Sequence, residues 1–471
     1  MKGLVWFRED IRIHDNTALY QAAKSCTDGI VGIFVIDAGL WRQHRMAACR
    51  VRFMLSGLEE LSASLQKRNI PLVIVQVNKT TDIAKIFQEY MKKYNLGTLF
   101  FNRQYELNEL RRDKQICDYL QKKYIQCNSY HDQTILAPGT VLTKKSNYFT
   151  VFTPYRKAWC YQLMNQENKI KINPLPKKNK NLIVQSTEVP SHIIGFSTKI
   201  IWPSGEKEAR RRLKQFIKNS LFNYQKYRDF PACFATSQLS PYLSAGMISA
   251  RECFLSAIFA NNGELMTGSK GAITWMTELI WREFYKHLLC AFPRLSMHKP
   301  FQLKTEKLPW RFNSKQMLAW KNGKTGYPII DAAMRQLNQT GWMHNRLRMI
   351  VAMFFTKNLF FDWRLGEDYF ISHLIDGDLA ANNGGWQWSA STGTDAAPYF
   401  RVFNPIRQSE RFDPKGDFIK KYCPELKAFD THAIHDPYGR APDLAKRCKY
   451  PKRIIDLNVS RRAAIKAFKM L

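Results

Sequence analysis

The run "GIVGIFVID" at residues 29–37 is apolar over almost its whole length and rich in β-branched side chains. Three similar runs lie near it: "GLVWFR" at 3–8, "IPLVIVQV" at 70–77 and "GTLFFN" at 97–102. Short apolar runs of this kind are typical of strands that are buried on both faces. They predict four strands in the first hundred residues.

Apolar residues recur with helical spacing over 50–68, 81–94 and 108–124. Strands that alternate with helices predict a Rossmann-like parallel sheet with right-handed crossovers. Ligands of such sheets bind at the carboxyl ends of the strands. We therefore expect an α/β domain over residues 1–130.

The pattern changes after residue 130. The basic stretch "KKNKNL" at 177–182 follows two prolines and has no period, so residues 131–205 are expected to form a long linker with one helix near 151–164. Beyond it, "TELIWREFYKHLL" at 277–289 and "HNRLRMIVAMFFTKNLFFDW" at 344–363 repeat apolar residues at i, i+3, i+4 and i+7. We expect an all-α domain over 206–471.

Length and composition agree with a globular chain of two or more domains, because 471 residues exceed the size at which one core stops growing. No apolar run reaches the ~20 residues of a membrane helix, and the first residues are charged, so we expect no membrane association, no signal peptide and a cytoplasmic location. The 10 cysteines show no metal-ligand spacing. Reduced thiols are the simplest interpretation.

The chain is strongly basic, with 72 Lys and Arg against 39 Asp and Glu, a net charge of +33. Such a field attracts polyanions, and nucleic acid is the commonest of these in a cell. A basic proteome or a need for solubility would also produce the excess. Charge alone leaves both interpretations open.

Two familiar nucleotide-binding patterns are excluded. "GKT" at Gly323–Thr325 is no P-loop, because Leu318 stands where that loop requires glycine. The chain also lacks G-x-G-x-x-G, which argues against a nicotinamide fingerprint.

Three other segments carry groups suited to a binding site. "TSQLS" at 236–240 can cap a helix or cradle a phosphate. Helical spacing puts Glu278, Trp281 and Tyr285 on one face, either a carboxylate in an aromatic pocket or a surface glutamate beside core rings. The same spacing aligns Trp342, Asn345, Arg348 and Met349, which fits a cavity wall or an ordinary helix edge.

The cluster "DGDLAANNGGWQWSASTGTDAAPYF" at 376–400 mixes polar groups and large rings. Asp376 and Asp378 could begin a metal site, but no third ligand follows at a suitable spacing, so capping and salt bridging is the stronger interpretation. Asn382 and Asn383 are poor helix formers whose amides are expected to act as hydrogen-bond donors or acceptors.

With these residues in view, the sequence resembles the DNA photolyase and cryptochrome family, and is most similar to the bacterial class I photolyases of cyclobutane pyrimidine dimers. The resemblance covers essentially the whole chain. Its longest motifs are "LVWFREDIRIHDN" at 4–16, "TELIWREFYKH" at 277–287, "GKTGYPIIDAAMRQLNQTGWMHNRLRM" at 323–349 and "DGDLAANNGGWQWSASTGTDAAPYFRVFNP" at 376–405.

The resemblance implies a U-shaped FAD in the helical domain. Asn382 is expected to face flavin N5, where an amide adds no negative charge beside the anionic reduced flavin. Asp376 is expected to pair with Arg348. The implied FAD-binding residues are Tyr224, Thr236, Ser237, Gln238, Leu239, Ser240, Trp275, Arg282, Arg348, Asp376, Gly377, Asp378 and Asn382; Trp386, Trp363 and Trp310 match the family's electron-carrying tryptophans.

The resemblance also implies light-driven repair: reduced FAD donates an electron to a flipped-out dimer, the cyclobutane ring opens, and the electron returns, so the enzyme would be a carbon–carbon lyase. If protonated or sharing a proton, Glu278 would hydrogen-bond the dimer carbonyl as charge builds there. The implied dimer pocket consists of Glu278, Trp281, Asn345, Met349 and Trp388, and the implied DNA contacts are Arg228, Arg346 and Arg401.

Asn345 and Met349 stand where enzymes for (6-4) photoproducts use two histidines, which favours the cyclobutane dimer as substrate. The chain ends about where the fold is expected to end, without a long signalling extension, so repair outranks the alternative of a cryptochrome-type blue-light receptor that signals through a partner. UV-damaged DNA is the expected partner. A positive groove that accepts duplex DNA from one side suggests a monomer, and a bacterial protein bound to DNA would join the nucleoid.

An antenna chromophore is expected on the N-terminal sheet, with 5,10-methenyltetrahydrofolate bound by His44, Asn108 and Glu109. Ser296 and Met297 replace the family's Cys-Lys pair, which leaves a deazaflavin or an empty site as alternatives. Gln238 replaces an arginine of the phosphate loop, where the backbone does much of the binding.

Overall fold

The computed structural model describes residues 2–165, 170–179, 184–193, 195–197 and 199–471. The chain forms two compact units, each described by itself. Unit 1 comprises Met1–Phe222, Ser237–Ser296 and Ile375–Asp378, and unit 2 comprises Asn223–Thr236, Met297–Leu374 and Leu379–Leu471. The expected linker, 131–205, lies partly outside the described residues.

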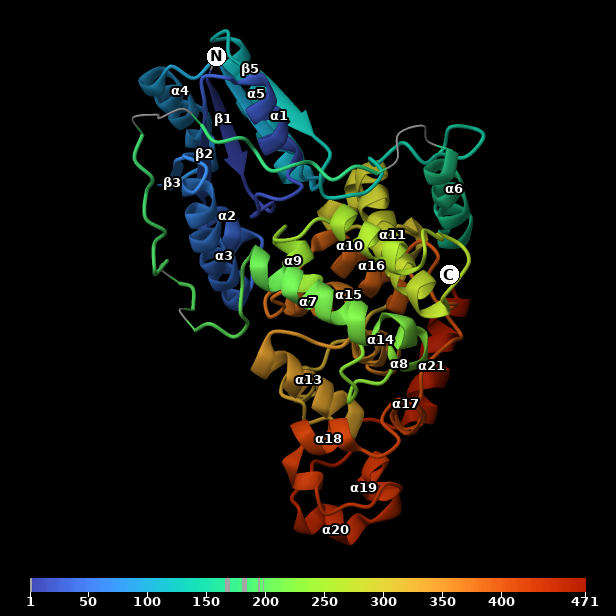
Figure 1. Ribbon diagram of the computed structural model, residues 1–471. Coiled ribbons are helices and arrows are strands. Elements are labelled where there is room, and N and C mark those ends of the chain that lie inside the picture. Colours follow the sequence, from blue (N-terminus) through green and yellow to red (C-terminus); the bar gives the residue numbers. More distant parts are fainter. Residues whose placement is uncertain (1, 166–169, 180–183, 194, 198) are drawn as a thin grey trace. The chain divides into compact units, whose positions relative to one another are not determined.

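Unit 1 contains a parallel sheet in the order β3-β2-β1-β4-β5 (Figure 1). The apolar runs form β1 (Gly3–Phe7), β2 (Ile30–Ile36), β3 (Leu72–Gln76) and β4 (Thr98–Asn102). All four predicted strands are therefore confirmed. The edge strand β5 (Gln126–Tyr130) was not predicted, because "QCNSY" is polar and pairs with β4 alone.

The predicted helices of this region are also confirmed, as α3 (Ala48–Gln66), α4 (Ile83–Tyr94) and α5 (Leu107–Gln121). Apolar side chains of α4 and α5 cover one sheet face, in a core with Trp6, Ile33 and Phe101. Two short helices were not predicted, α1 (Thr17–Ser25) and α2 (Ala38–Gln43).

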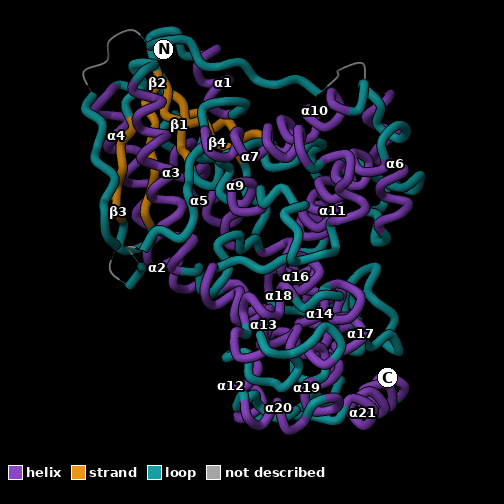
Figure 2. The backbone as a smooth tube through the Cα atoms, turned by 60° about the horizontal axis from the view of Figure 1, so that its bottom comes forward, coloured by secondary structure: helices purple, strands orange, loops and turns teal. Residues whose placement is uncertain are grey.

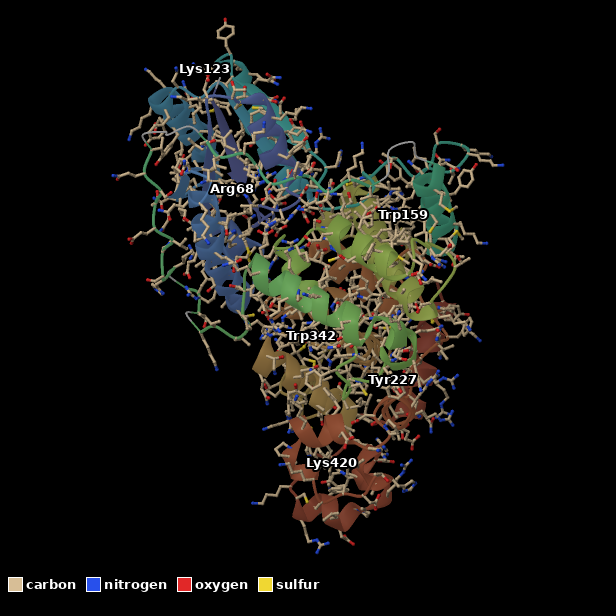
Figure 3. All side chains as sticks on the ribbon, viewed as in Figure 1. Arg68, Lys123, Trp159, Tyr227, Trp342 and Lys420 are labelled. Atoms are coloured by element: carbon tan, nitrogen blue, oxygen red, sulfur yellow. The ribbon has the colours of Figure 1, made fainter. Side chains whose placement is uncertain are left out.

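The remaining helices of unit 1 are α6 (Phe152–Asn165), α7 (Glu206–Asn219), α9 (Ser240–Ser244), α10 (Ala250–Ala260) and α11 (Lys270–Ala291). The expected helix near 151–164 is thus confirmed. Trp159 of α6, labelled in Figure 3, donates its indole N–H to Glu283 of α11 at 2.5 Å. This bond ties the two helices together.

A buried ionic network joins the sheet region of unit 1 to α10. Arg12 contacts Asp132 at 2.5 Å, and Arg251 contacts Asp132 at 2.7 Å and Asp15 at 2.9 Å. Burial alone would raise the pKa of Asp132, but the two guanidinium groups hold it well below its usual range. The motif "REDIRIHDN" therefore connects the sheet to the helical part of its own unit.

Unit 2 is helical, with a core around α13 that includes Trp320, Phe355, Trp363 and Trp386. Figure 2 shows every strand of the described chain in the N-terminal region, as the change of pattern predicted. The helices are α8 (Tyr224–Tyr227), α12 (Ser314–Lys321), α13 (Pro328–Thr340), α14 (Asn345–Met353), α15 (Trp363–Ile371), α16 (Leu379–Ala390), α17 (Pro405–Phe412), α18 (Asp417–Tyr422), α19 (Pro437–Arg440), α20 (Pro442–Arg447) and α21 (Leu457–Lys469); a π-helical turn covers Phe354–Asn358.

Short 3-10 turns complete the chain, at Thr80–Asp82, Leu221–Asn223, Pro293–Met297, Leu303–Lys307, Pro424–Leu426 and Ala433–His435. Among the described helices, none combines the length and the apolar character needed to cross a bilayer.

The "GKT" segment has a structural role in unit 2. The backbone N–H of Thr325 and that of Gly326 donate to the carboxylate of Asp331, at 2.6 and 3.1 Å, and Tyr450 donates to the same group at 2.5 Å. The loop is closed on a carboxylate at the start of α13. This geometry explains the motif without a phosphate.

Candidate functional site

The loop ahead of α9 has the backbone shape of an anion cradle. Gln238 has a left-handed φ of 50°, and Leu239 follows with φ −88° and ψ −5°. Consecutive left- and right-handed residues turn successive N–H groups to one side, which suits a phosphate. Arg212 of α7 donates to the Gln238 side chain at 3.1 Å, so a guanidinium lies beside the position where the family's arginine is missing. Unit 1 contains Ser237, Leu239 and Ser240 of this loop. Unit 2 contains Thr236 and Tyr224.

Helix α11 carries the next group along one half-exposed face. Glu278, Trp281 and Tyr285 all lie partly exposed, while Trp275 is buried against Phe216, with 4.9 Å between ring centroids. The ring centroids of Trp281 and Tyr285 lie 5.7 Å apart, which confirms that the two side chains share one face of α11. Phe152 of α6 stacks on Trp281, with 3.6 Å between the ring centroids and an interplanar angle of 10°. One face of the indole is thus covered, by a residue that sequence spacing did not reveal.

Arg282, also on α11, is fixed by backbone carbonyls of its own unit. Its guanidinium donates to Gln133 O at 2.6 Å and to Leu243 O at 3.3 Å. Carbonyls orient the guanidinium without neutralising its charge. It is therefore suited to an anionic or carbonyl-rich ligand.

The segment Asp376–Asp378 is held inside unit 1. Asp378 forms an ion pair with Lys286 of α11 at 2.8 Å, and Ser244 donates to Gly377 O at 3.1 Å. Asp376 is buried. Its expected partner Arg348 lies in unit 2, so that pair stays a prediction. Within the described part of the chain, no three His, Cys, Asp or Glu side chains converge as metal ligands.

In unit 2, the buried Asn382 of α16 has a defined amide orientation. Its nitrogen donates to Glu367 O at 3.0 Å, so its oxygen remains to accept a hydrogen bond from a ligand. Asn383 donates instead to the Glu367 carboxylate at 2.9 Å and accepts from Gln387 at 2.8 Å. The two neighbouring asparagines therefore differ: Asn382 can serve a ligand, and Asn383 holds α16 to α15.

The three predicted relay tryptophans all lie in unit 2. Trp386 and Trp363 are fully buried, while Trp310 is half-buried and packs against Phe360 at 5.0 Å. Trp310 is therefore the most exposed of the three tryptophans. A path that carries electrons to the surface requires such an exposed last member.

Residues of the implied DNA side form a second group in unit 2. Asn345 and Met349 project from one partly exposed face of α14, and Trp388 is half-buried. Trp342 lies ahead of α14, which begins at Asn345, so the expected alignment of Trp342 with that face is wrong.

Asp229 organises two of the predicted DNA-contact arginines. Arg346 forms an ion pair with Asp229 at 2.9 Å, and Arg228 lies 3.9 Å from the same carboxylate. Arg401 is exposed next to Phe403. Sequence reasoning did not include Asp229; its position directly after Arg228 was the available signal.

The predicted antenna residues meet at the carboxyl end of the sheet in unit 1. The amide of Asn108 lies 3.2 Å from His44 Nε2, and His44 Nδ1 lies 3.4 Å from Glu109. Burial lowers the pKa of His44 and raises that of Glu109, because it disfavours both charged forms. Three side chains from two separate segments thus lie together, with one hydrogen bond between Asn108 and His44, where ligands of parallel sheets bind.

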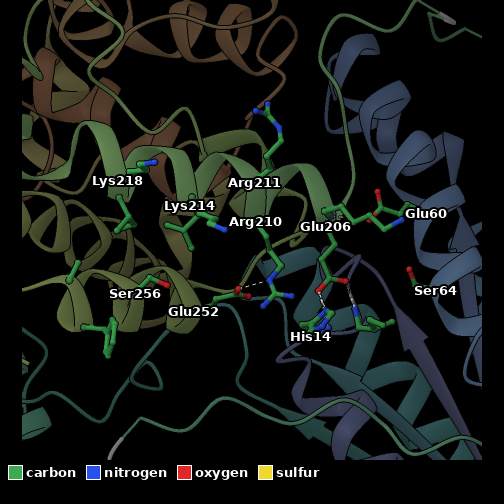
Figure 4. Close-up of a pocket in the computed structure, with 16 residues that line it drawn as sticks. His14, Glu60, Ser64, Glu206, Arg210, Arg211, Lys214, Lys218, Glu252 and Ser256 are labelled. Carbon is green, nitrogen blue, oxygen red and sulfur yellow. Dashed lines mark hydrogen bonds and ion pairs between the residues drawn. The ribbon is translucent and has the colours of Figure 1, made fainter.

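A cavity of about 760 Å³ lies elsewhere in unit 1, between α3, α7 and α10 (Figure 4). Its carboxylates are already bound: Glu252 by Arg210 at 2.6 Å, Glu206 by His14 at 2.5 Å, and Glu60 by the backbone N–H of Lys207 at 2.9 Å. None of the predicted site residues lines this cavity. It is distinct from the residues assigned to FAD.

Comparison with known proteins gives concordant results. A family model described as DNA photolyase matches residues 3–178, and one described as the FAD binding domain of DNA photolyase matches 275–470. The chain is 40% identical to the deoxyribodipyrimidine photo-lyase of Escherichia coli (strain K12) over 469 residues, 99% of this chain and 98% of the relative.

Two solved structures are similar over the whole length. A bacterial class III photolyase from Agrobacterium tumefaciens gives a TM-score of 0.86 at 32% identity, covering 100% of this chain and 97% of that one. A cryptochrome from Synechocystis sp. PCC6803 gives 0.87 at 26% identity, covering 99% of both chains.

Proposed function

The chain belongs to the DNA photolyase family, and we propose that the residues assigned above hold FAD and a pyrimidine dimer for light-driven DNA repair. The protein is a deoxyribodipyrimidine photo-lyase that acts on cyclobutane dimers. The observation that carries this function is the face of α11, where Glu278, Trp281 and Tyr285 line up half-exposed. A receptor that only signals has no use for such a face.

The FAD-binding residues fit the cofactor chemically. The cradle at Gln238 offers backbone N–H groups to the pyrophosphate, and Arg282 brings a fixed positive charge. The Asn382 oxygen can accept from the ring N–H of the reduced flavin, because Glu367 O engages the amide nitrogen. Reduced FAD supplies, on excitation by light, the electron that opens the cyclobutane ring. Tyr224, Thr236, Trp275, Arg348 and Asp376 complete this proposed site.

The dimer is proposed to be held between an aromatic wall and polar groups. Phe152 covers one face of Trp281, which leaves the other face for the flipped-out bases, with Trp388 and Met349 as further apolar walls. Glu278 and Asn345 provide the hydrogen bonds. A carboxyl group that keeps its proton can donate to the dimer carbonyl and so stabilise the negative charge that develops there.

The DNA backbone is proposed to bind Arg228, Arg346 and Arg401. Asp229 orients the first two, and the charge of +33 attracts the duplex as a whole. One lesion occupies one pocket, so we propose a monomer. We also propose a cytoplasmic protein that joins the nucleoid when it binds DNA.

His44, Asn108 and Glu109 are proposed to hold an antenna chromophore, 5,10-methenyltetrahydrofolate in the first instance. A deazaflavin is the second candidate, because Ser296 and Met297 replace the Cys-Lys pair. Absorption spectroscopy of the chromophores released from purified protein distinguishes them.

The domain boundaries at 130 and 205 remain a sequence-based proposal.

The test of function uses purified, chemically reduced protein and an oligonucleotide with one thymine cyclobutane dimer. Loss of the dimer in blue light but not in the dark, with a (6-4) lesion left intact, is the expected result. If bound, reduced FAD fails to repair the dimer, the photoreceptor alternative replaces this proposal.

A further inference from the structure

A lysine with no role in the site described above is completely buried in unit 2. Lys357 lies in the π-helical turn Phe354–Asn358 that follows α14, and its exposed fraction is 0%. Its neighbours Phe355 and Thr356 are equally buried. An ammonium group removed from water is costly unless specific partners compensate it. Single-turn π-bulges also occur often at functional sites.

The partners of Lys357 come from two distant parts of the unit. Nζ donates to Ser391 Oγ at 2.8 Å, and it lies 3.7 Å from the ring centroid of Phe468 in α21. Burial lowers the pKa of Lys357 to about 7. Both charge states of the amine keep N–H donors for Ser391.

Ser391 is the first residue of the loop that follows α16. It has a left-handed φ of 61°, and its hydroxyl donates across the loop to Ala397 O at 2.5 Å. The backbone N–H groups of Ser391 and Ala397 both donate to Trp388 O, at 3.3 and 3.1 Å. The loop is thus folded back on Trp388, and the Ser391 hydroxyl closes it.

We propose that Lys357 is a positioning residue for substrate, which holds the loop from Ser391 to Arg401 and so fixes Trp388 and Arg401 for the dimer-containing DNA. The chain of contacts is continuous: Lys357 to Ser391, Ser391 to Ala397, and the backbone N–H groups of Ser391 and Ala397 to Trp388 O. Arg401 follows directly, with its N–H bound to Pro398 O at 2.9 Å. This inference rests on the proposed roles of Trp388 and Arg401.

An apolar side chain of similar length would pack in the same space without the cost of a buried amine. A methionine there should leave the free energy of unfolding unchanged or increase it, because burying a polar amine is unfavourable. It would leave Ser391 without its donor. Stability and DNA binding are therefore expected to change in different directions, which a residue that only supports the fold would not do.

The experiment compares the holoenzyme with Lys357→Met and with Ser391→Ala. Amide hydrogen exchange is measured over residues 391–401 without DNA, together with the Tm and the Kd for a dimer-containing oligonucleotide. In both variants we expect faster exchange at Ala397 and a Kd weaker by about five- to tenfold, the effect of one lost hydrogen bond, with the Tm kept or raised in Lys357→Met. The matched control is Lys466→Met, which removes the same charge from an exposed position of α21.

Unchanged amide hydrogen exchange over residues 391–401 in both variants would contradict the proposal that Lys357 holds this loop, which we call the tether. Faster exchange with an unchanged Kd, or an equal loss of affinity in Lys466→Met, would overturn the positioning role. If the wild-type protein itself does not repair dimers, the proposed function fails, and exchange at Ala397 still tests the tether.

Discussion

The amide nitrogen of Asn382 donates to Glu367 O, which fixes the side of the amide on which the oxygen lies and leaves that oxygen to accept from a ligand. Similar local constraints act on the other site residues: two carbonyls fix Arg282, Asp229 fixes Arg346, and Phe152 fixes Trp281. Each of these orienting groups is either far from its site residue in the sequence or of a residue type, such as a backbone carbonyl or a phenylalanine, that gives no signal of a binding site. Residue types in the site were therefore open to prediction, and the groups that orient them were not.

Asn382→Asp should disfavour the reduced cofactor. A carboxylate cannot donate to Glu367 O, and its charge repels an anionic flavin, so we expect the midpoint potential of bound FAD to fall by on the order of 50 mV. Spectroelectrochemical titration measures this shift. Asn383→Asp is the matched control; an equal shift in both variants would contradict a special role for Asn382.

Glu278→Ala should reduce the repair rate of DNA-bound, reduced enzyme by about tenfold or more, because the dimer carbonyl loses a hydrogen bond while charge develops on it. FAD content should remain unchanged. Glu278→Gln keeps a donor and should recover most of the rate. Single-turnover repair after a light pulse measures the effect, and wild-type rates in Glu278→Ala would remove this residue from the mechanism.

At the scale of elements, α15 and α16 pack so closely that glycine is required between them. A Cβ added to Gly366 would lie 2.1 Å from the ring of Trp386. The ring itself is held by Phe355 and Phe370, at centroid distances of 5.5 and 4.9 Å. The position of Trp386, which is proposed for the electron relay, therefore depends on the absence of one methyl group.

Gly366→Ala should lower the free energy of unfolding by about 1–3 kcal/mol, because the rigid indole cannot yield without displacing its neighbours. Thermal unfolding measures the loss. The control is Gly385→Ala in α16, where an added Cβ meets no atom within 4 Å and the unfolding free energy should stay level or rise by about 0.5–1 kcal/mol. Equal destabilisation by both variants would contradict the role of the indole contact, because an added Cβ meets no atom within 4 Å at Gly385.

Elements with strong periodicity were predictable from sequence. The buried strands β1 to β4 and the long helices α3, α4, α5 and α11 follow from runs of apolar residues. The strand β5 and the helix α1 escaped prediction because pairing and packing with the rest of the sheet, rather than their own pattern, stabilise them. Local spacing also misjudged Trp342, since the end of a helix depends on capping and not on the apolar repeat.

At the scale of the whole molecule, two buried histidines make stability depend on pH. Burial lowers the pKa of His287 and that of His344 to about 4 in the folded protein, while the unfolded chain keeps about 6.5. Between these values the unfolded state binds more protons, so the free energy of unfolding falls as the pH drops from 6.5 to 4, by at most about 3 kcal/mol for each histidine.

His287→Phe should lower the slope of the unfolding free energy against pH by the contribution of one proton. The side chain between Tyr148 and Tyr155 then no longer titrates. Denaturant unfolding at several pH values gives the slope for wild type and variant. Parallel curves for the two proteins would show that His287 is protonated in the folded state.

The division into units was the least predictable property. Spacing and composition separate an α/β region from a helical one, but unit 1 also takes α7, α9, α10, α11 and Ile375–Asp378 from the later part of the chain. Long-range contacts such as the Arg251–Asp132 pair decide this membership, and no local pattern reports them.

The ion pair of Lys286 and Asp378 has a consequence for the synthesis of the protein. Lys286, only 1% exposed, leaves the ribosome long before Asp378 does. Until translation passes residue 378, the nascent unit 1 contains a lysine destined for burial without this ion-pair partner. A nonsense fragment that ends before Asp378 carries this defect permanently, and cellular proteases should degrade it faster than a fragment that ends just after it.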